Sequence, residues 1–177
     1  MDAQSPRLLI VRLSAIGDVV HGLPVLCALR AQFPAGFLAW VVEGRAGDLL
    51  EGHRALDELI RLPRGWLKSP RAIWDLRRRL RGLRLDAAID LQGLSRSAIA
   101  AWLSGAPRRI GFARPQGREI SPWLSTVRVR TSGPHVIEHN LQLLEPLVEL
   151  IVLHSQIAAD RAELLGFNAY PSVAGNL

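Results

Sequence analysis

The loop 14–18, with the sequence Ser-Ala-Ile-Gly-Asp, places a carboxylate directly after the first apolar run of the chain, residues 8–13. A carboxylate at the mouth of a cleft can act as a general base and take a proton from a hydroxyl group. Gly17 allows a tight turn or a close approach of a ligand to the backbone. The competing interpretation is that Asp18 only caps the following helix, because aspartate is a favoured N-cap residue.

Three polar residues lie close to Asp18 in the sequence, and each has a structural alternative to a functional role. Arg12 either pairs with Asp18, contacts an anionic group of a substrate, or packs at the end of its strand. Ser14 either binds substrate or holds the loop backbone through its hydroxyl. His21 either assists in the cleft or has a structural role beside a helix start.

Short apolar strands alternate with amphipathic helices in the segments that would position these residues. This order predicts an α/β fold, a doubly wound, Rossmann-like parallel sheet, which binds ligands beyond the carboxyl ends of its strands. We therefore expect function in the loops 14–18, 43–47, 63–70, 92–96 and 111–122. Where the fourth strand closes, Asp90 and Gln92 either face the cleft or satisfy loop amides. The predicted strands are 8–13, 37–43, 59–62, 85–91, 108–112 and 127–129, and the predicted helices are 24–32, 45–52, 70–83, 95–103 and 136–150.

The charge of the chain points to an anionic partner. Lys and Arg outnumber Asp and Glu by 22 to 16, and Lys68 is the only lysine. Arginine binds phosphates and carboxylates with two parallel hydrogen bonds, so phosphorylated substrates, phospholipid headgroups and nucleic acid are all candidates. The single cysteine, Cys27, cannot form an internal disulfide, and no apolar run is long enough to span a bilayer. We expect a cytoplasmic protein, with peripheral association with the inner membrane as an option.

Two familiar nucleotide-binding patterns are missing from the first loop. A dinucleotide-binding fold would carry G-x-G-x-x-G there, whereas this loop offers Gly17 and then Gly22. The P-loop pattern is also absent. The sequence therefore disfavours an oxidoreductase or an NTPase.

The opening segment 9–24, LIVRLSAIGDVVHGLP, resembles the opening of glycosyltransferase family 9, the ADP-heptose:lipopolysaccharide heptosyltransferases. Further segments resemble the same family in the same order, and the resemblance covers about residues 8–150. They are WVVE at 40–43, DAAIDLQGL at 86–94 followed by Ser97-Ala98, Gly111-Phe112, Arg118-Glu119 and His139-Asn140.

The resemblance implies a GT-B enzyme with two Rossmann-like domains that inverts the sugar's anomeric centre without a metal cofactor. In this family the amino-terminal domain holds the lipopolysaccharide core acceptor and the carboxy-terminal domain holds the ADP-sugar. The catalytic aspartate falls on Asp18, with Arg12 and Ser14 in the same motif. By the same resemblance Arg64, Lys68 and Arg118 would meet the acid groups of the acceptor, with His21 and Gln92 as further cleft residues.

The second half of such an enzyme is not recognisable in this sequence. We expect residues 1–150 to form the acceptor-side domain and residues 151–177 to be a tail or truncated linker, so the chain alone would not transfer sugar. A non-catalytic basic module for anionic glycans or nucleic acid is the alternative. Nucleic-acid readers display a coherent basic face, whereas the arginines here are spread over helices and loops.

Overall fold

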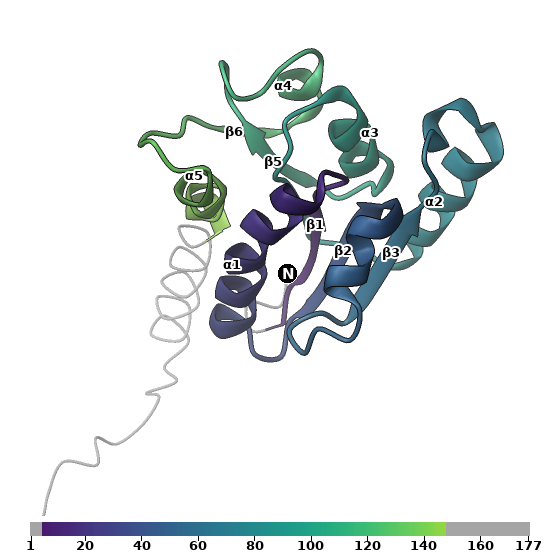
Figure 1. The fold of residues 1–177 in the computed structure, drawn as a ribbon, viewed down its shortest axis with the longest axis horizontal. Helices are drawn as coiled ribbons and strands as arrows, with labels where there is room; N and C mark the ends of the chain where they lie inside the picture. The colour runs from purple at the N-terminus through teal and green to yellow at the C-terminus, as the bar shows by residue number, and fades with distance from the viewer. Residues whose placement is uncertain (1–4, 148–177) are drawn as a thin grey trace, which may run out of the picture.

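The structure, a computed structural model, describes residues 5–147 of the 177-residue chain. Its centre is a six-stranded sheet in the order β3-β2-β1-β4-β5-β6, in which each neighbouring pair is parallel (Figure 1). This is the strand order of a doubly wound Rossmann-type sheet, as predicted. The strands are β1 (Arg7–Val11), β2 (Phe37–Glu43), β3 (Glu58–Leu62), β4 (Ala87–Asp90), β5 (Arg108–Phe112) and β6 (Val127–Val129).

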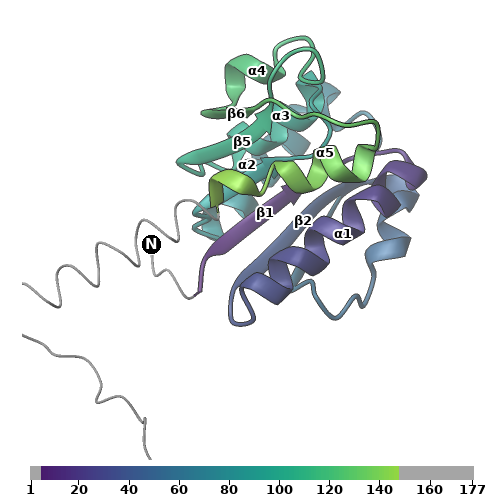
Figure 2. The same ribbon diagram turned by 90° about the vertical axis from the view of Figure 1, so that its left-hand side faces the viewer.

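Helices cover both faces of the sheet (Figure 2). One face carries α1, η1 and α5, and the other carries α2 and α3. The short helix α4 follows β5 at the end of the sheet where β6 lies. The helices are α1 (Ile16–Gln32), η1 (Gly44–Leu50), η2 (Trp66–Lys68), α2 (Pro70–Gly82), α3 (Ser95–Leu103), α4 (Ser121–Leu124) and α5 (Val136–Gln142).

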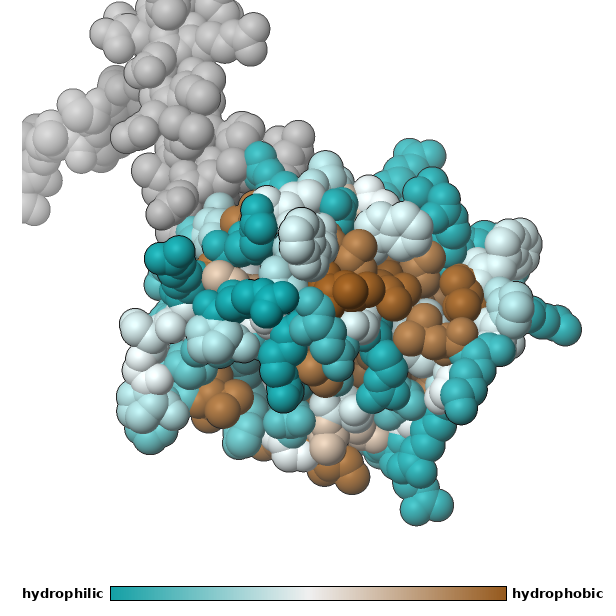
Figure 3. All heavy atoms as spheres, turned by 90° about the horizontal axis from the view of Figure 1, so that it is seen from above, coloured by the Kyte–Doolittle hydropathy of each residue, from teal (hydrophilic) through white to brown (hydrophobic). Residues whose placement is uncertain are grey.

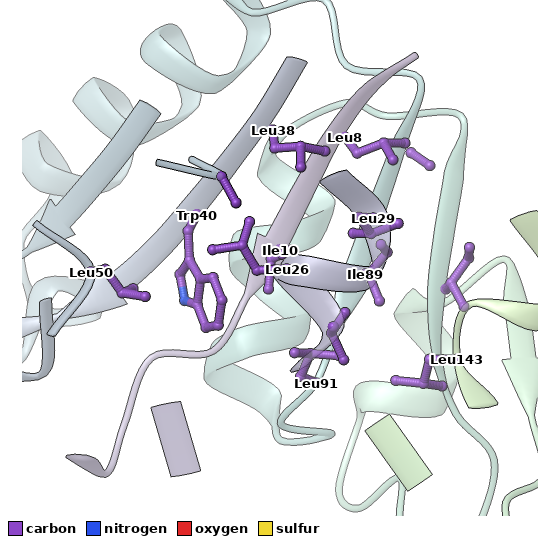
Figure 4. Packing of buried hydrophobic residues seen from close by; sticks show 14 of the residues in the cluster. Leu8, Ile10, Leu26, Leu29, Leu38, Trp40, Leu50, Ile89, Leu91 and Leu143 are labelled. Atoms are coloured by element: carbon purple, nitrogen blue, oxygen red, sulfur yellow. The ribbon is translucent and has the colours of Figure 1, made fainter. Parts of the chain in front are cut away.

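The apolar residues of each central strand divide between two cores, because successive side chains of a strand point to opposite faces. Leu8 and Ile10 of β1 pack under α1, and Leu9 and Val11 pack under α2 and α3. Figure 4 shows the first core, with Trp40 and several leucines and isoleucines enclosed between the sheet and its helices. Burial on both faces explains why these strands are continuous apolar runs rather than alternating ones.

Two predicted helices differ from the structure by more than two residues at one end. The helix predicted from Pro24 begins eight residues earlier, at Ile16, so Pro24 lies inside α1. Proline is favoured in a first turn and costs about 3 kcal/mol inside a helix. The buried residues Val19 and Val25 on either side of it hold the helix together across this position. The helix predicted over 136–150 is interrupted: α5 ends at Gln142, residues 143 and 144 form a turn, and the backbone is helical again at 145–147.

The short helices η2 and α4 were not predicted, because each is only one turn long and has no periodicity to detect. The predicted tail, 151–177, lies outside the described residues. Within residues 5–147, no helix has the length and apolar character that crossing a bilayer requires.

Candidate active site

The loop after β1 lies where the two halves of the sheet diverge. β1 has β2 on one side and β4 on the other, and the chain continues outward in both directions from this pair. In doubly wound folds the crevice at the carboxyl ends of such strands is the usual ligand site. Asp18 is the third residue of α1, which starts at this crevice directly after β1.

The carboxylate of Asp18 is held from two sides and still faces solvent. Its Oδ1 pairs with Nη2 of Arg12 at 2.8 Å, and its Oδ2 accepts the backbone N–H of Ala15 at 3.1 Å. The side chain of Asp18 is 44% exposed, whereas that of Arg12 is 9% exposed. Asp18 therefore does satisfy a donor at the helix start, from the third helical position rather than as the N-cap. Because each carboxylate oxygen has more than one acceptor site, capacity remains for a substrate hydroxyl.

Arg12 is a buried arginine that connects the Asp18 loop to the neighbouring strand. Besides Asp18, its guanidinium donates to the backbone oxygen of Leu91, just after β4. Its own backbone oxygen accepts from the indole N–H of Trp40 at 3.2 Å. Of the three roles considered for Arg12, the structure therefore shows pairing with Asp18 and packing at the strand end.

The backbone after β1 is tied to both flanking strands. The N–H of Leu13 donates to Oε1 of Gln92 at 2.9 Å, and the N–H of Glu43 donates to the oxygen of Leu13 at 2.8 Å. Gln92 thus joins the end of β1 to the end of β4. A site on rigid strand ends holds its side chains more closely than one on a free loop.

A hollow of about 540 Å³ opens beside this loop, which we call the arginine hollow. Arg96 pairs with Glu43 at 3.0 Å, whereas Arg45 and Arg64 have no ion-pair partner among residues 5–147. The hollow therefore carries a net positive charge, as an anion site requires. Its lining residues are Ser14, Ala15, Ile16, Gly17, Glu43, Arg45, Ala46, Arg64 and Arg96.

Gly17 lines the arginine hollow with backbone alone. A methyl group added at Gly17 would meet no other atom within 4 Å, and the residue is helical. The fold itself therefore does not need glycine here, contrary to the tight turn that the sequence suggested. The missing side chain keeps the wall of the arginine hollow open, which leaves room for a ligand.

A second hollow, of about 240 Å³, borders Arg12. Arg118 reaches it from the loop after β5, and His139 and Asn140 reach it from α5. Asn140 is buried and donates from Nδ2 to the backbone oxygen of His21 at 3.1 Å, which fixes α5 against α1. The lining residues are Arg12, Leu91, Gln92, Phe112, Gln116, Arg118, Val136, His139 and Asn140.

Asp90 has the structural role that the sequence left open. It is 2% exposed, and its Oδ1 accepts the N–H groups of Gln92 and Gly93 at 2.9 and 3.1 Å. Burial raises the pKa of Asp90, and the hydrogen bonds from these amides, Ser97 and Ser121 counteract it only in part. Asp90 thus shapes the turn beside the site and faces away from solvent.

Glu119 holds the loop after β5 against α3. Its carboxylate accepts the N–H of Ser95 at 2.9 Å. Hydrogen bonds from Ser95, helped by the nearby charges of Arg118 and Arg96, lower the pKa of Glu119. The contact keeps Arg118 close to the start of α3.

The structure brings together most, but not all, of the residues expected at the site. Asp18, Arg12 and Ser14 adjoin one another, Arg64 shares the arginine hollow with Ser14, and Gln92 and Arg118 share the second hollow. Lys68 is exposed in η2 and lines neither hollow. His21 is exposed one turn after Asp18. Its part in the described structure is the hydrogen bond that its backbone oxygen accepts from Asn140.

Two tryptophans lie differently from what the sequence around them predicts. The apolar helix 95–103 predicts a core position for Trp102, but this side chain is 47% exposed, because it lies on the outer side of α3. The segment around Trp66 predicts a loop with the indole available to a ligand, but Trp66 is buried, because the unpredicted helix η2 folds it inward. The spacing of Asp75 and Arg79, one helical turn apart, predicts an ion pair between them, but Arg79 pairs with Glu58 instead.

Sequence reasoning missed Glu43, Arg45 and Arg96 as individual site residues. All three lie in loops that were expected to carry function, directly after β2 or at the start of α3. These residues could have been found because their loops follow the strands that neighbour β1. The contact between Arg96 and Glu43 could not be predicted, because the two residues are 53 positions apart in the sequence.

A larger hollow, of about 710 Å³, lies away from this crevice beside the edge strand β3. Two of its three arginines are paired, Arg61 with Asp48 and Glu51 and Arg79 with Glu58, and three carboxylates line it as well. Because the acidic and basic side chains of this hollow balance, we assign the ligand site to the two smaller hollows beside the loop that precedes Asp18 and beside Arg12. Across residues 5–147 there is no group of three or more His, Cys, Asp or Glu side chains arranged to hold a metal ion.

Comparison with known proteins gives a single family. The model of glycosyltransferase family 9 (heptosyltransferase) matches residues 73–164. Lipopolysaccharide heptosyltransferase 1 of Pseudomonas aeruginosa is 30% identical over 149 residues, which are 77% of this chain and 41% of that protein. The lipopolysaccharide core heptosyltransferase OpsX of Haemophilus influenzae is 29% identical over 141 residues, 76% of this chain and 39% of that protein. The chain therefore spans about two fifths of the length of these relatives.

Solved structures show the same likeness. The E. coli heptosyltransferase WaaC with ADP superposes with a TM-score of 0.68 at 26% identity, over 96% of this chain and 50% of that one. The E. coli ADP-heptose lps heptosyltransferase II superposes with a TM-score of 0.62 at 23% identity, over 77% of this chain and 39% of that one, which shows the fold. The alternative of a non-catalytic basic module is not favoured by these relatives.

Proposed function

Because the chain belongs to glycosyltransferase family 9, we propose that it is the acceptor-binding half of an inverting, heptosyltransferase-like enzyme in which Asp18 is the general base. The observation that carries the proposal is the half-exposed carboxylate of Asp18, which buried Arg12 fixes directly after residues 14–17 of the arginine hollow's lining. A carboxylate that is both oriented and open to solvent can approach a hydroxyl group.

In this proposal an acceptor hydroxyl lies within hydrogen-bond distance of Asp18, about 2.6–3.2 Å between heavy atoms. The hydroxyl proton moves to a carboxylate oxygen of Asp18 while the hydroxyl oxygen forms a bond to the anomeric carbon of an ADP-sugar. The bond from that carbon to the phosphate oxygen breaks, and its electron pair leaves on ADP. Arg12 keeps the carboxylate aimed at the crevice, so less orientational freedom is lost when the reaction begins.

The acceptor would be held by charge in the arginine hollow. Arg45 and Arg64 have no ion-pair partner among the described residues, and the N-terminus of the seventeen-residue helix α1 opens at the same place. Helix N-termini and unpaired arginines both favour anions. An anionic lipopolysaccharide core, with its phosphate or carboxylate groups, has the matching chemistry. Arg118 would contact it from the second hollow, and Lys68 would meet it only at longer range.

The ADP-sugar would bind to a second, carboxy-terminal domain of the kind that the longer relatives have room for. One solved relative is E. coli WaaC with ADP-2-deoxy-2-fluoro heptose, which supports an ADP-sugar as donor. In this division residues 1–150 are the acceptor side and the donor is a substrate rather than a cofactor. A lipid-linked acceptor would place the enzyme at the cytoplasmic surface of the inner membrane.

The test is sugar transfer by a joined enzyme, in which this chain is followed by the carboxy-terminal half of E. coli WaaC. Replacing Asp18 by Asn keeps a hydrogen-bond acceptor for Arg12 but removes the base, so kcat should fall by about 10²–10⁴-fold. The matched control is Asp48→Asn, which removes an exposed, paired carboxylate in η1. Normal turnover by the Asp18→Asn enzyme would refute the assignment of the base.

A second measurement addresses the division between the halves. Titration calorimetry of the 177-residue chain with an ADP-sugar should show little binding, whereas a deacylated lipopolysaccharide-core acceptor should bind. Micromolar affinity of the chain alone for the ADP-sugar would contradict the proposal that the donor site lies on a separate domain.

A further inference from the structure

A second exposed cluster, the tryptophan patch, lies around α4 and β6. Trp123 is 80% exposed, which is more than any other large hydrophobic residue described as exposed. It borders a hollow of about 360 Å³ whose charged residues are all arginines. The patch consists of Ala113, Arg114, Pro122, Trp123, Arg128 and Arg130.

The arginines of the tryptophan patch have no ion-pair or hydrogen-bond partner among residues 5–147. This holds for Arg114, Arg128 and Arg130 alike, and no acidic side chain lines the hollow. The situation differs at Arg30 and Arg61, where each guanidinium is neutralised by a carboxylate at 2.5 Å. Three arginines kept without counter-charges on one exposed surface have a field that favours phosphate groups.

Two of these arginines lie in or directly after the strand β6. Arg128 in β6 and Arg130 just after it are both exposed, whereas Val127 and Val129 of the strand are partly buried. Alternation along a strand therefore presents both guanidinium groups on the outer side. Arg114 joins them from the loop that follows β5, next to β6 in the sheet.

The tryptophan patch adjoins the same edge of the sheet as Asp18. The loop that begins at Ala113 follows the carboxyl end of β5, as the Asp18 loop follows that of β1. In Figure 1, α4 and β6 lie near the top, toward which β1 runs. Figure 3 looks down on this top face and shows apolar groups intermixed with strongly hydrophilic ones. A surface that contacted the patch would therefore lie beside the crevice.

We propose that the tryptophan patch docks on an anionic phospholipid bilayer, with the indole of Trp123 at the headgroup level and the three arginines on lipid phosphates. Tryptophan favours the membrane interface because its ring is apolar and its N–H is polar. Each arginine near an anionic membrane surface strengthens binding by about fivefold. This inference rests on the proposed function, because docking on the membrane would bring the crevice to a lipid-linked acceptor.

The experiment measures cosedimentation of the 177-residue chain with vesicles of phosphatidylcholine, with and without phosphatidylglycerol. We expect binding only to the vesicles that contain phosphatidylglycerol. Changing Arg114, Arg128 and Arg130 together to Gln should weaken it by about 100-fold, from about fivefold for each arginine. Trp123→Ser should also weaken binding and should abolish the quenching of tryptophan fluorescence by brominated lipid that the patch contributes.

The matched control lies on α2, which carries its own exposed tryptophan and arginines. Trp74 is 57% exposed and stacks with Arg78 at 4.7 Å. The control variants are Trp74→Ser and the triple change of Arg71, Arg78 and Arg81 to Gln, which removes the same charge. They should leave vesicle binding within about threefold of the unchanged chain, since charges beyond a Debye length, about 8–10 Å, are screened.

Several results would overturn the inference. Equal loss of binding in both triple variants would show that net charge alone attracts the chain to the membrane. Equal binding to both vesicle types would show that the patch does not recognise anionic lipid. Loss of vesicle binding in the joined enzyme would mean that the donor half covers the patch. Transfer to a deacylated acceptor separates this inference from the proposed function. Patch variants should retain that transfer, whereas Asp18→Asn should lose it and still bind vesicles.

Discussion

The pair between Arg12 and Asp18 makes a quantitative prediction for a double-mutant cycle. The perturbations are Arg12→Met, which keeps the length of the side chain without its charge, and Asp18→Asn, alone and combined. At the observed 2.8 Å, two unit charges attract by about 1.5 kcal/mol in water and by about 6 kcal/mol at an effective dielectric constant of 20. Desolvation of the buried guanidinium offsets part of this attraction.

The exposure of the two partners places the expected coupling between known limits. Exposed ion pairs contribute about 0.2–1 kcal/mol, and breaking buried ones costs about 3–5 kcal/mol. Since Asp18 is 44% exposed and Arg12 is buried, we expect a coupling energy of about 1–3 kcal/mol. Arg12→Met should be the more damaging single change, because it also leaves the buried oxygen of Leu91 without its donor, at about 1–3 kcal/mol.

The assay is urea unfolding followed by the fluorescence of the buried indoles Trp40 and Trp66. Unchanged slopes against urea would show that the variants alter stability rather than the extent of unfolding. A coupling energy below about 0.3 kcal/mol would mean that the two side chains act independently, since that is the usual scatter for residues that do not interact. The proposed orientation of Asp18 by Arg12 would then be wrong.

Four further outcomes follow from other parts of the structure. Because burial raises the pKa of Asp90, its contribution to stability is full below its unfolded pKa and is lost as pH rises through the folded value. Asp90→Asn should therefore gain stability relative to the unchanged chain as pH rises, and parallel pH curves in urea unfolding would contradict this. Gly22→Ala should cost about 1–3 kcal/mol in the same assay, because its methyl group would lie 2.7 Å from the ring of buried Trp40. Gly17→Ala in the same helix should cost no stability but should weaken acceptor binding in calorimetry. A Gly17→Ala chain that loses stability and binds the acceptor normally would show that no ligand contacts the arginine hollow at Gly17. Changing Arg45 and Arg64 together to Gln should weaken acceptor binding and its dependence on salt, whereas Arg71 and Arg78 changed in the same way should not.

The strands could be predicted from the sequence because both faces of this sheet are covered. A doubly buried strand is a short, continuous apolar run, and the one at 37–43 has the predicted bounds in the structure. The strands at 108–112 and 127–129 also have the predicted bounds, although each carries arginine and is less buried. The start of α1 was misplaced because a local preference of proline was weighed without the packing of Val19 against the sheet. Boundaries set by tertiary contacts are not visible in local patterns.

In the candidate site, too, local sequence predicted some features, whereas others depend on tertiary contacts. The position of Asp18 beyond the first strand followed from fold class, and its pairing with Arg12 was one of the roles considered because the two residues are close in sequence. The pair between Glu43 and Arg96 depends on which strands neighbour β1, so it needed the strand order. The burial of Trp66 and the exposure of Trp102 depend on the direction of single turns, which residue type does not determine.

Whether Asp18 is the base is measured by the rate of sugar transfer by the joined enzyme at saturating acceptor, with Asp or Asn at position 18. The Asn enzyme should bind the deacylated acceptor with nearly unchanged affinity, while its kcat falls by about 10²–10⁴-fold. An Asn enzyme that transfers sugar at the rate of the unchanged one would show that Asp18 is not the base.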